Sequence, residues 1–217
     1  MMGPAHPDAS PEPGSGDLRA RKAALREAFT KRRRGLSAAL RAAASKAVCE
    51  RLVSLPELAG ARSVVLYAPR KGAGEIDLRE AFEALRRAGV KLRLPRCVSD
   101  ERLEFVEVAA WEDLRPGRYG IPEPEGPADE GLSGADRVVL PGVAFDHAGG
   151  RLGSGRGYFD RSLPGEAQTA PLLIGVGYWW QRVGHRLPVE PHDRRMDLLV
   201  TDHEVFRFSA PKNGGTL

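Results

Sequence analysis

Residues 63–94 read SVVLYAPRKGAGEIDLREAFEALRRAGVKLRL. The β-branched, uncharged run at 63–67 predicts a buried strand, and residues 90–94 predict a second one. Between the two strands, Asp77 can cap a helix that Gly89 ends. The apolar positions of that helix recur at helical spacing and are Leu78, Phe82 and Leu85. A strand, a helix and a strand in succession predict one βαβ unit, with two parallel strands and a covering helix.

More strands are predicted on the carboxyl side of this unit. Residues 103–108 (LEFVEV) alternate in the way that a half-buried strand does. Further buried runs lie at 137–141, 172–176, 198–201 and 205–208. Strands separated by helices favour a parallel or mixed sheet that helices cover on both faces. We therefore expect one α/β domain over residues 17–210.

Two helices are predicted on the amino-terminal side. From Asp17, a candidate N-cap, apolar residues recur at the period of a helix with one buried stripe. These residues are Leu18, Leu25, Phe29, Leu36 and Leu40. Gly35 and Ser37 indicate a break and a restart, and the second helix should end near Pro56. Its apolar face is expected at Leu40, Ala44, Val48 and Leu52.

The two ends of the chain differ from this domain. Residues 1–16 hold four Pro and three Gly and no large apolar residue apart from two Met, so we expect a disordered extension. We expect residues 211–217 to be a flexible tail. No run of roughly 18 uncharged apolar residues is present, and residues 1–16 lack the order of a secretory signal. The expected location is the cytoplasm.

The composition is that of an ordinary globular protein. Of the 217 residues 41% are hydrophobic and 29% are charged, which excludes a disordered or fibrous chain. Residues 17–51 hold 11 Lys or Arg against 3 Asp or Glu, a local charge of +8 against +4 for the whole chain. The basic excess is therefore confined to one segment. The two cysteines, Cys49 and Cys97, form neither a disulfide framework nor a zinc motif.

The densest group of glycines predicts a loop that binds an anion. Gly153, Gly155 and Gly157 alternate with Ser154 and Arg156 just before a short helical stretch. Glycines at alternate positions let backbone N–H groups approach an anion closely, and Arg156 adds positive charge. A phosphate would suit this loop. The spacing matches neither the dinucleotide fingerprint nor the P-loop, so an ordinary glycine-rich turn remains an alternative.

Carboxylates occur at the end of this loop and in a second segment. Asp160 ends the loop, and Glu190, Asp193 and Asp197 lie between two buried runs. A carboxylate beside a phosphate repels it unless a divalent cation lies between them, which favours Mg²⁺ beside Asp160, and Asp193 could reach the same ion. The alternatives are an Asp160 paired with Arg161 in a first helical turn, and a solvated turn with surface ion pairs in the second segment.

Six short strings of the sequence point to one family. They are KAALR at 22–26, EID at 75–77, LPGVAFD at 140–146, GSGRGYFDR at 153–161, LPVEPHD at 187–193 and DLLVT at 197–201. Together they resemble the 5-formyltetrahydrofolate cyclo-ligase family, also called methenyltetrahydrofolate synthetase, over most of the chain after residue 17. The glycine-rich string is the specific one. The resemblance implies a single-domain, three-layer α/β/α fold of Rossmann-like topology with a mostly parallel or mixed sheet.

The resemblance also implies which residues bind the substrates. Residues implied to bind the ATP phosphates are Lys22, Arg26, Arg151, Leu152, Gly153, Ser154, Gly155, Arg156, Gly157, Tyr158 and Phe159. Residues implied to contact the folate are Glu75, Ser154, Gly155, Arg156, Gly157 and Tyr158. Asp160 and Asp193 are the implied ligands of Mg²⁺.

The implied reaction is the cyclisation of 5-formyltetrahydrofolate to 5,10-methenyltetrahydrofolate with ATP and Mg²⁺, through an iminophosphate, with release of ADP and phosphate. Such chemistry needs positioning and charge neutralisation rather than a nucleophilic side chain. We take Arg156, which stands between two glycines, as the candidate for stabilising the phosphoryl charge, and Tyr158 as a second catalytic candidate. We expect a monomer that binds small molecules and neither nucleic acid nor membrane.

Other functions remain open at this point. The chain could be a family paralogue that acts on another formyl or amide substrate, or a non-catalytic module that binds a nucleotide or a sugar phosphate. A nucleic-acid-binding protein would have to use the basic segment at 17–51, but the known nucleic-acid-binding signatures are missing.

Two features of the sequence have no assigned part in the chemistry. We expect Arg32, Arg33 and Arg34 to form a solvated face. Trp179 and Trp180 depart from the family pattern, and we expect them to act in packing or as a pocket wall rather than in chemistry.

Overall fold

The computed structural model of the protein describes most of the chain. The described residues are 15–100, 102–129, 132, 135–163, 170–188, 190 and 193–208. The expected tail at 211–217 and the expected extension up to residue 14 lie outside them. The first helix begins at Ser15, so the extension expected over residues 1–16 is wrong for residues 15 and 16, and Asp17 lies in the first turn of the helix. The prediction of an N-cap at Asp17 is therefore wrong.

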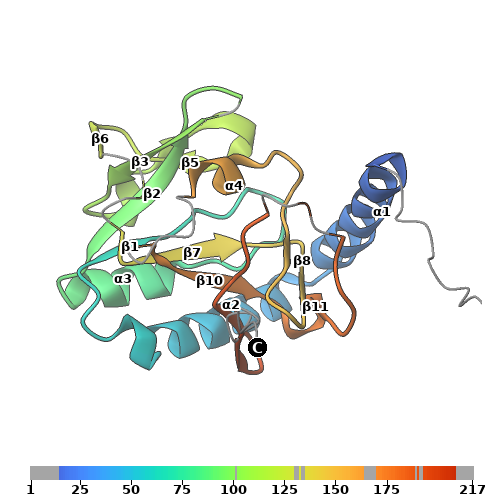
Figure 1. The fold of residues 1–217 in the computed structure, drawn as a ribbon. Helices are drawn as coiled ribbons and strands as arrows, with labels where there is room; N and C mark the ends of the chain where they lie inside the picture. Colours follow the sequence, from blue (N-terminus) through green and yellow to red (C-terminus); the bar gives the residue numbers. More distant parts are fainter. Residues whose placement is uncertain are drawn as a thin grey trace, which may run out of the picture.

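The described residues form helices and strands in the order that Figure 1 shows. The α-helices are α1 (Ser15–Arg34), α2 (Ala38–Val53), α3 (Arg79–Arg87) and α4 (Tyr158–Ser162). The 3-10 helices are η1 (Pro56–Leu58), η2 (Trp111–Asp113), η3 (Arg118–Gly120) and η4 (Trp179–Gln181). The strands are β1 (Ser63–Val65), β2 (Lys91–Cys97), β3 (Leu103–Glu107), β4 (Arg115–Pro116), β5 (Pro122–Glu123), β6 (Ala128–Asp129), β7 (Arg137–Pro141), β8 (Ala144–Asp146), β9 (Arg151–Leu152), β10 (Leu172–Gly177), β11 (Arg182–Val183), β12 (Leu198–Thr201) and β13 (Val205–Arg207).

The central sheet has eight strands in the order β13-β12-β10-β7-β1-β2-β3-β6. The inner strands from β12 to β2 are parallel, and β13, β3 and β6 join through antiparallel pairs. The predicted mostly parallel, mixed sheet is therefore confirmed. In chain order the parallel strands run 2-1-3-4-5 across the sheet, so the connections leave β1 and β7 in opposite directions. A ligand cleft opens at such a switch point, beyond the carboxyl ends of the strands.

Side chains alternate between the two faces of the sheet. Val64 and Val139 pack in one core cluster with α2 and α3, whereas Val65 and Val138 pack in a second cluster that includes Leu163, just after α4. Figure 1 shows α2 and α3 on one side of the sheet and α4 on the other. The expected three-layer α/β fold is confirmed.

The helix boundaries follow local chemistry, with one error in the predicted core. The Ser37 hydroxyl accepts a hydrogen bond from the Leu40 N–H and caps α2. Leu40 is 60% exposed, so the prediction that it belongs to the buried face is wrong, whereas the other predicted positions are buried. The N-cap residue of α3 is Leu78, so the prediction that Asp77 occupies this position is wrong, although the Asp77 carboxylate accepts a 3.0 Å hydrogen bond from the N–H of Arg79, the first residue of α3.

A small second sheet places α1 beside the glycine-rich loop. Strands β11, β8 and β9 form this sheet. Leu25 and Phe29 of α1 pack against its apolar residues, among them Ala144 and Leu152. Since β9 leads directly into the glycine-rich loop, α1 is fixed against the root of that loop. None of the described helices is long and apolar enough to cross a membrane.

Asp146 ties this small sheet to the segment that carries Glu190 and Asp193. The side chain is 1% exposed, and its two oxygens accept hydrogen bonds from the backbone N–H groups of Ala148, Gly150 and Leu187. We expect Asp146→Ala to lower the free energy of unfolding by about 3 kcal/mol, because it leaves buried donors without an acceptor.

Urea unfolding followed by circular dichroism measures this effect. The control is Asp113→Ala in η2, which removes an exposed carboxylate and should change the free energy of unfolding by no more than about 0.5 kcal/mol. Equal stabilities for the two variants would contradict the assignment.

Candidate active site

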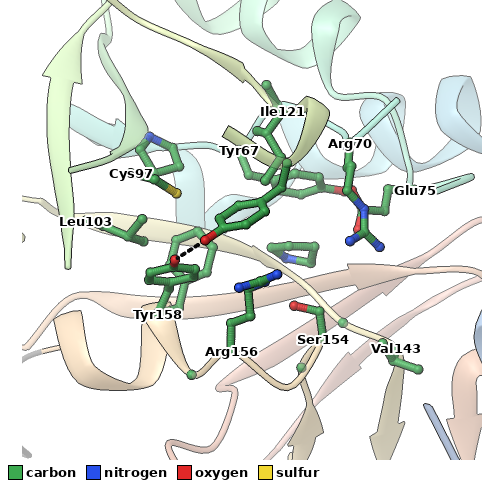
Figure 2. A pocket seen from close by; sticks show the side chains of 18 of the residues that line it. Tyr67, Arg70, Glu75, Cys97, Leu103, Ile121, Val143, Ser154, Arg156 and Tyr158 are labelled. Atoms are coloured by element: carbon green, nitrogen blue, oxygen red, sulfur yellow. Dashed lines mark hydrogen bonds between the residues drawn. The ribbon is translucent and has the colours of Figure 1, made fainter. Parts of the chain in front are cut away.

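A large pocket lies at the switch point of the sheet. It encloses about 930 Å³ of empty space, part of which is open to solvent. Tyr67, Ala68 and Arg70 beyond β1 and Gly142 and Val143 beyond β7 line it, as do residues of the glycine-rich loop. We call it the switch-point pocket. Figure 2 shows Arg70 and Glu75 at one end, Cys97, Leu103 and Tyr158 at the other, and Ser154 and Arg156 entering from the loop.

A second pocket lies against the same loop. It encloses about 650 Å³, and Lys22, Arg26, Glu190 and Asp193 contribute to its lining. We call it the charged pocket. The residues common to both pockets are Arg151, Gly153, Arg156, Gly157 and Asp160. The glycine-rich loop, residues 151–160, is therefore a wall that the two pockets share.

The glycines of this loop are required by its geometry. Gly155 and Gly157 have φ angles of +98° and +65°, in the left-handed region that disfavours side chains. A Cβ atom at Gly155 would lie 3.3 Å from the Arg26 Nε, and one at Gly157 would lie 2.8 Å from an Arg161 guanidinium nitrogen. The Arg26 Nε also donates a 3.0 Å hydrogen bond to the Gly153 carbonyl, which clamps the loop onto α1.

A buried arginine holds the two ends of the loop together. The Arg151 side chain is 3% exposed and donates a 2.6 Å hydrogen bond to Asp160 Oδ1. It also donates to the Pro141 carbonyl at the end of β7, at 3.2 Å. Its Nε is buried and has no hydrogen-bond partner in the described part of the chain. Asp160 therefore pairs with Arg151 rather than with Arg161, the alternative weighed from the sequence.

Lys22 brings the second acidic segment to the charged pocket. Its Nζ donates to Glu190 Oε2 at 2.6 Å and to Asp193 Oδ2 at 2.9 Å, and the side chain is 7% exposed. Burial alone would lower the pKa of Lys22, but the hydrogen bonds to Glu190 and Asp193 outweigh it and raise the pKa above its ordinary value. Lys22 is therefore a cation at neutral pH, between two carboxylates.

The donor set permits a divalent cation only with help from a ligand. Asp160 and Asp193 line the same pocket, as predicted, but the described residues contain no group of three His, Cys, Asp or Glu able to hold a metal. Mg²⁺ is commonly held by one or two carboxylates together with substrate phosphates and waters. Two carboxylates therefore fit Mg²⁺ when phosphate oxygens complete its shell. Asp197 serves the fold instead, since it accepts the Leu173 N–H at 2.8 Å.

Glu75 lines the switch-point pocket next to Arg33, an arginine that the sequence analysis had placed on a solvated face. Its Oε2 accepts the Arg70 N–H at 2.8 Å, and its Oε1 lies 3.4 Å from a guanidinium nitrogen of Arg33. The prediction that Arg33 is solvated is wrong, because the residue is 3% exposed. Its helical phase could have revealed this, since Arg33 follows Phe29 by four residues on the buried stripe of α1.

Tyr119 is a pocket residue that the sequence did not reveal. The Arg156 guanidinium carbon lies 3.8 Å from the centre of the Tyr119 ring, a cation–π contact. The Tyr119 hydroxyl donates a 2.6 Å hydrogen bond to Asp100 and lies 3.3 Å from the Tyr158 hydroxyl. The bond to Asp100, followed by that to Tyr158, raises the pKa of Tyr119 to about 12. Tyr119 is the one described non-glycine residue with a positive φ, +59°.

The two tryptophans lie away from both pockets. The Trp180 ring stacks between Tyr178 and Phe29, with ring centres 5.5 Å and 5.9 Å apart. Trp179 is 50% exposed and stacks on His203. Neither tryptophan lines the switch-point pocket or the charged pocket. Packing, one of the roles expected for them, is what the structure shows for Trp180.

Comparison with known proteins gives a consistent result. Residues 18–202 match the sequence profile of the 5-formyltetrahydrofolate cyclo-ligase family. The 5-formyltetrahydrofolate cyclo-ligase of Mycolicibacterium smegmatis is 31% identical over 188 residues, which are 83% of this chain and 93% of that protein. The Escherichia coli K12 protein of the same name is 30% identical over 181 residues, 82% of this chain and 98% of its own.

A solved structure agrees with these relatives. The NMR structure of the 5,10-methenyltetrahydrofolate synthetase of Aquifex aeolicus superposes with a TM-score of 0.73 and 35% sequence identity. The superposition covers 90% of this chain and 95% of that one. The similarity therefore extends over both pockets and the loop between them.

The charged pocket should bind polyanions through Lys22. We expect Lys22→Met to weaken the binding of inorganic triphosphate at least ~10-fold, because two carboxylates then remain without their cation. Isothermal titration calorimetry in a buffer that contains Mg²⁺ measures this affinity. Lys31→Met, which removes an exposed lysine of the same helix, is the matched control and should leave the affinity unchanged. Similar affinities for the two variants would show that Lys22 does not act on the anion.

Proposed function

Since the chain belongs to the 5-formyltetrahydrofolate cyclo-ligase family of ligases, we propose that it converts 5-formyltetrahydrofolate to 5,10-methenyltetrahydrofolate with MgATP, and releases ADP and phosphate. The observation that carries this proposal is the wall of residues 151–160 between the two pockets. A nucleotide on one side of the wall and a formylated substrate on the other would meet at the same backbone segment. Positioning of this kind accounts for much of the catalysis in phosphoryl transfer.

The charged pocket would hold the ATP phosphates. Lys22, Arg26 and Arg151 supply positive charge, and the backbone of the loop residues that line this pocket, from Leu152 to Gly157 without Ser154, can supply N–H groups. Ser154, Tyr158 and Phe159, which were also expected to bind ATP, line the switch-point pocket instead. The unpartnered Nε of Arg151 is a donor that a ligand could use. Lys22 and Arg151 already hold Asp193 and Asp160 in this pocket, so the carboxylates are in place before any ligand arrives.

We assign Asp160 and Asp193 as the protein ligands of Mg²⁺. A bound Mg²⁺ would neutralise phosphate charge and allow the triphosphate to lie beside these carboxylates. Two ion pairs, Lys22–Asp193 and Arg151–Asp160, fix the positions of the carboxylates that would bind the ion.

The switch-point pocket would hold the folate. The carboxylate of Glu75 suits the N–H and amino donors along the pyrimidine edge of the pterin ring. The other end, near Leu103 and Tyr158, is then left for the benzoyl part and the tail. Ser154 and Arg156 enter between these ends, so the formyl group of a substrate in this orientation would lie against the glycine-rich loop.

The chemistry proposed at the loop balances without a nucleophilic side chain. The γ-phosphoryl group moves from ATP to the formyl oxygen, ADP leaves, and the neighbouring N10 attacks the formyl carbon. The C–O bond then breaks, and the N10 proton leaves with the phosphate. Cys97 is the thiol in this pocket, but burial and then the charge of Glu123 raise its pKa to about 11. It is therefore a neutral thiol rather than a nucleophile.

Arg156 and Tyr158 would act on the transferred group and its surroundings. Arg156 lines both pockets, so its guanidinium can approach the phosphoryl group from the shared wall. In the structure it rests on the ring of Tyr119, whose hydroxyl contacts that of Tyr158. We assign Tyr158 the task of shaping the pocket around Arg156. We also propose that the protein acts as a monomer, since one chain supplies both pockets. The proposed location is the cytoplasm.

The proposal is tested by following the absorbance of 5,10-methenyltetrahydrofolate with purified protein, 5-formyltetrahydrofolate and ATP. We expect product only when Mg²⁺ is present, and we expect Asp160→Asn to lower kcat/KM at least ~100-fold by removing a metal ligand. Asp113→Asn is the exposed control and should keep full activity. Product formation in excess EDTA, or full activity of Asp160→Asn, would remove the metal assignment.

Arg156 gives a separate test of the transfer step. We expect Arg156→Ala to lower kcat about 100-fold while the melting temperature stays within ~2 °C, because the exposed side chain contributes little to stability. Arg115→Ala, which truncates an exposed arginine of β4, is the control. An unchanged kcat with unchanged KM values for ATP and folate would exclude this role for Arg156.

A further inference from the structure

Arg33 is a buried cation that the proposed reaction does not yet use. It belongs to the last turn of α1, and its side chain is 4% exposed. The guanidinium donates to the carbonyls of Ala73 and Gly142, at 2.8 Å and 3.2 Å, and to Glu75 Oε1 at 3.4 Å. Ala73 follows β1, whereas Gly142 follows β7. One side chain thus joins both walls of the switch-point pocket to α1.

The segment that carries Glu75 is held at each of four consecutive residues. The Ala73 carbonyl accepts from Arg33 and the Gly74 carbonyl from the Tyr178 hydroxyl, at 2.9 Å. The Ile76 carbonyl accepts from the Tyr67 hydroxyl at 2.8 Å. The fourth residue, Glu75, is held through its side chain rather than through its backbone carbonyl.

The two oxygens of Glu75 are held from different directions. Arg33 donates to Oε1, and the Arg70 N–H donates to Oε2 at 2.8 Å. An ionised carboxylate offers about four acceptor sites, so these two bonds fix the plane of the group and leave capacity for a ligand. Figure 2 shows Glu75 beside Arg70 at one end of the pocket.

The backbone of α1 also touches this segment. Gly74 has a φ of +67°, and a Cβ atom there would lie 2.8 Å from the Arg33 carbonyl oxygen. The end of the helix is therefore in direct contact with the residue before Glu75. A side chain in position 74 would push the two apart.

We propose that Arg33 is a positioning residue that sets the orientation of the Glu75 carboxylate toward the N–H donors of the folate ring, and thereby the affinity for 5-formyltetrahydrofolate. This inference rests on the proposed function, in which Glu75 contacts the folate. A guanidinium suits the task because its planar fork holds one carboxylate and two carbonyls in a fixed geometry, which an ammonium cannot reproduce.

A set of variants separates positioning from a general structural role. The single variants are Arg33→Met, Arg33→Lys and Glu75→Gln, and the double variant combines Arg33→Met with Glu75→Gln. Arg34→Met is the matched control, because Arg34 is the exposed neighbour of Arg33 in the same helix. For each protein, calorimetry measures the affinity for 5-formyltetrahydrofolate, and initial rates give the KM values for both substrates.

We expect Arg33→Met to weaken the binding of 5-formyltetrahydrofolate about 10-fold, with a matching rise in the KM for this substrate. The KM for ATP should change less than about twofold, because Arg33 lies outside the charged pocket. Arg33→Lys should fall between the wild type and Arg33→Met, because it keeps the charge and loses the fork. In the Glu75→Gln background, Arg33→Met should add less than about twofold, since the group that it positions is already altered. Arg34→Met should match the wild type.

Other results would overturn the inference. A folate affinity that Arg33→Met leaves unchanged, an equal rise in both KM values, or an equal effect with and without Glu75→Gln would each do so. If Arg33→Met does not fold, Arg33→Lys takes its place in the same comparison. A wild-type protein that binds 5-formyltetrahydrofolate without cyclising it would refute the proposed function and leave the binding comparison decisive for Arg33. A wild type that does not bind it would refute both.

Discussion

One stretch of backbone has to separate two pockets and be reached from both. The loop of residues 151–160 meets this constraint because glycines, which have no side chains, form part of the wall that the two pockets share. Gly155 and Gly157 adopt left-handed conformations, and a Cβ atom at either position would press on an arginine. Glycines have no side chains that could pack against the rest of the protein and hold the loop in place. The shape of the loop therefore depends on two side-chain contacts: Arg26 of α1 donates to the Gly153 carbonyl, and Arg151, at the start of the loop, donates to Pro141 and to Asp160.

Buried cations hold the site together. Lys22, Arg33 and Arg151 are each at least nine-tenths buried, and each has carboxylate or carbonyl partners in the described part of the chain. A buried ion without partners costs several kcal/mol, and the fold offsets this cost by bringing acceptors to these residues. Most of those acceptors are carboxylates or loop carbonyls of the two pockets. Fold stability and site geometry are thus linked through the same ion pairs.

The elements that sequence predicted best are those whose own residues determine them. The runs at 137–141 and 198–201 coincide with β7 and β12, because uninterrupted apolar residues in short segments have few alternatives to a buried strand. The glycine-rich loop was also recognisable, since the spacing of its glycines and Asp160 is a local property. The fold class followed from the succession of these elements along the chain.

The parts that sequence did not reveal depend on partners distant in the chain. Leu40 has the helical phase of a core residue, but the first turn of α2 extends beyond the surface that α3 and β12 cover. Arg33 has the helical phase of a buried residue, but its acceptors lie 40 and 109 residues away in the chain, so the sequence does not show which groups it binds. Tyr119 reaches the pocket through a turn of η3 that no periodicity indicates. Each of these positions is decided by tertiary contact rather than by local preference.

Helix α1 carries cations to both pockets, with Lys22 at one and Arg33 at the other. Eleven residues separate them, which is about 16 Å along a helix axis. An α-helix is stiff over that length, so a ligand that displaced one end of α1 would also displace the other end. If the first substrate to bind fixes the position of α1, the second binds to a helix that is already in place, and by thermodynamic reciprocity the gain in affinity is the same whichever binds first.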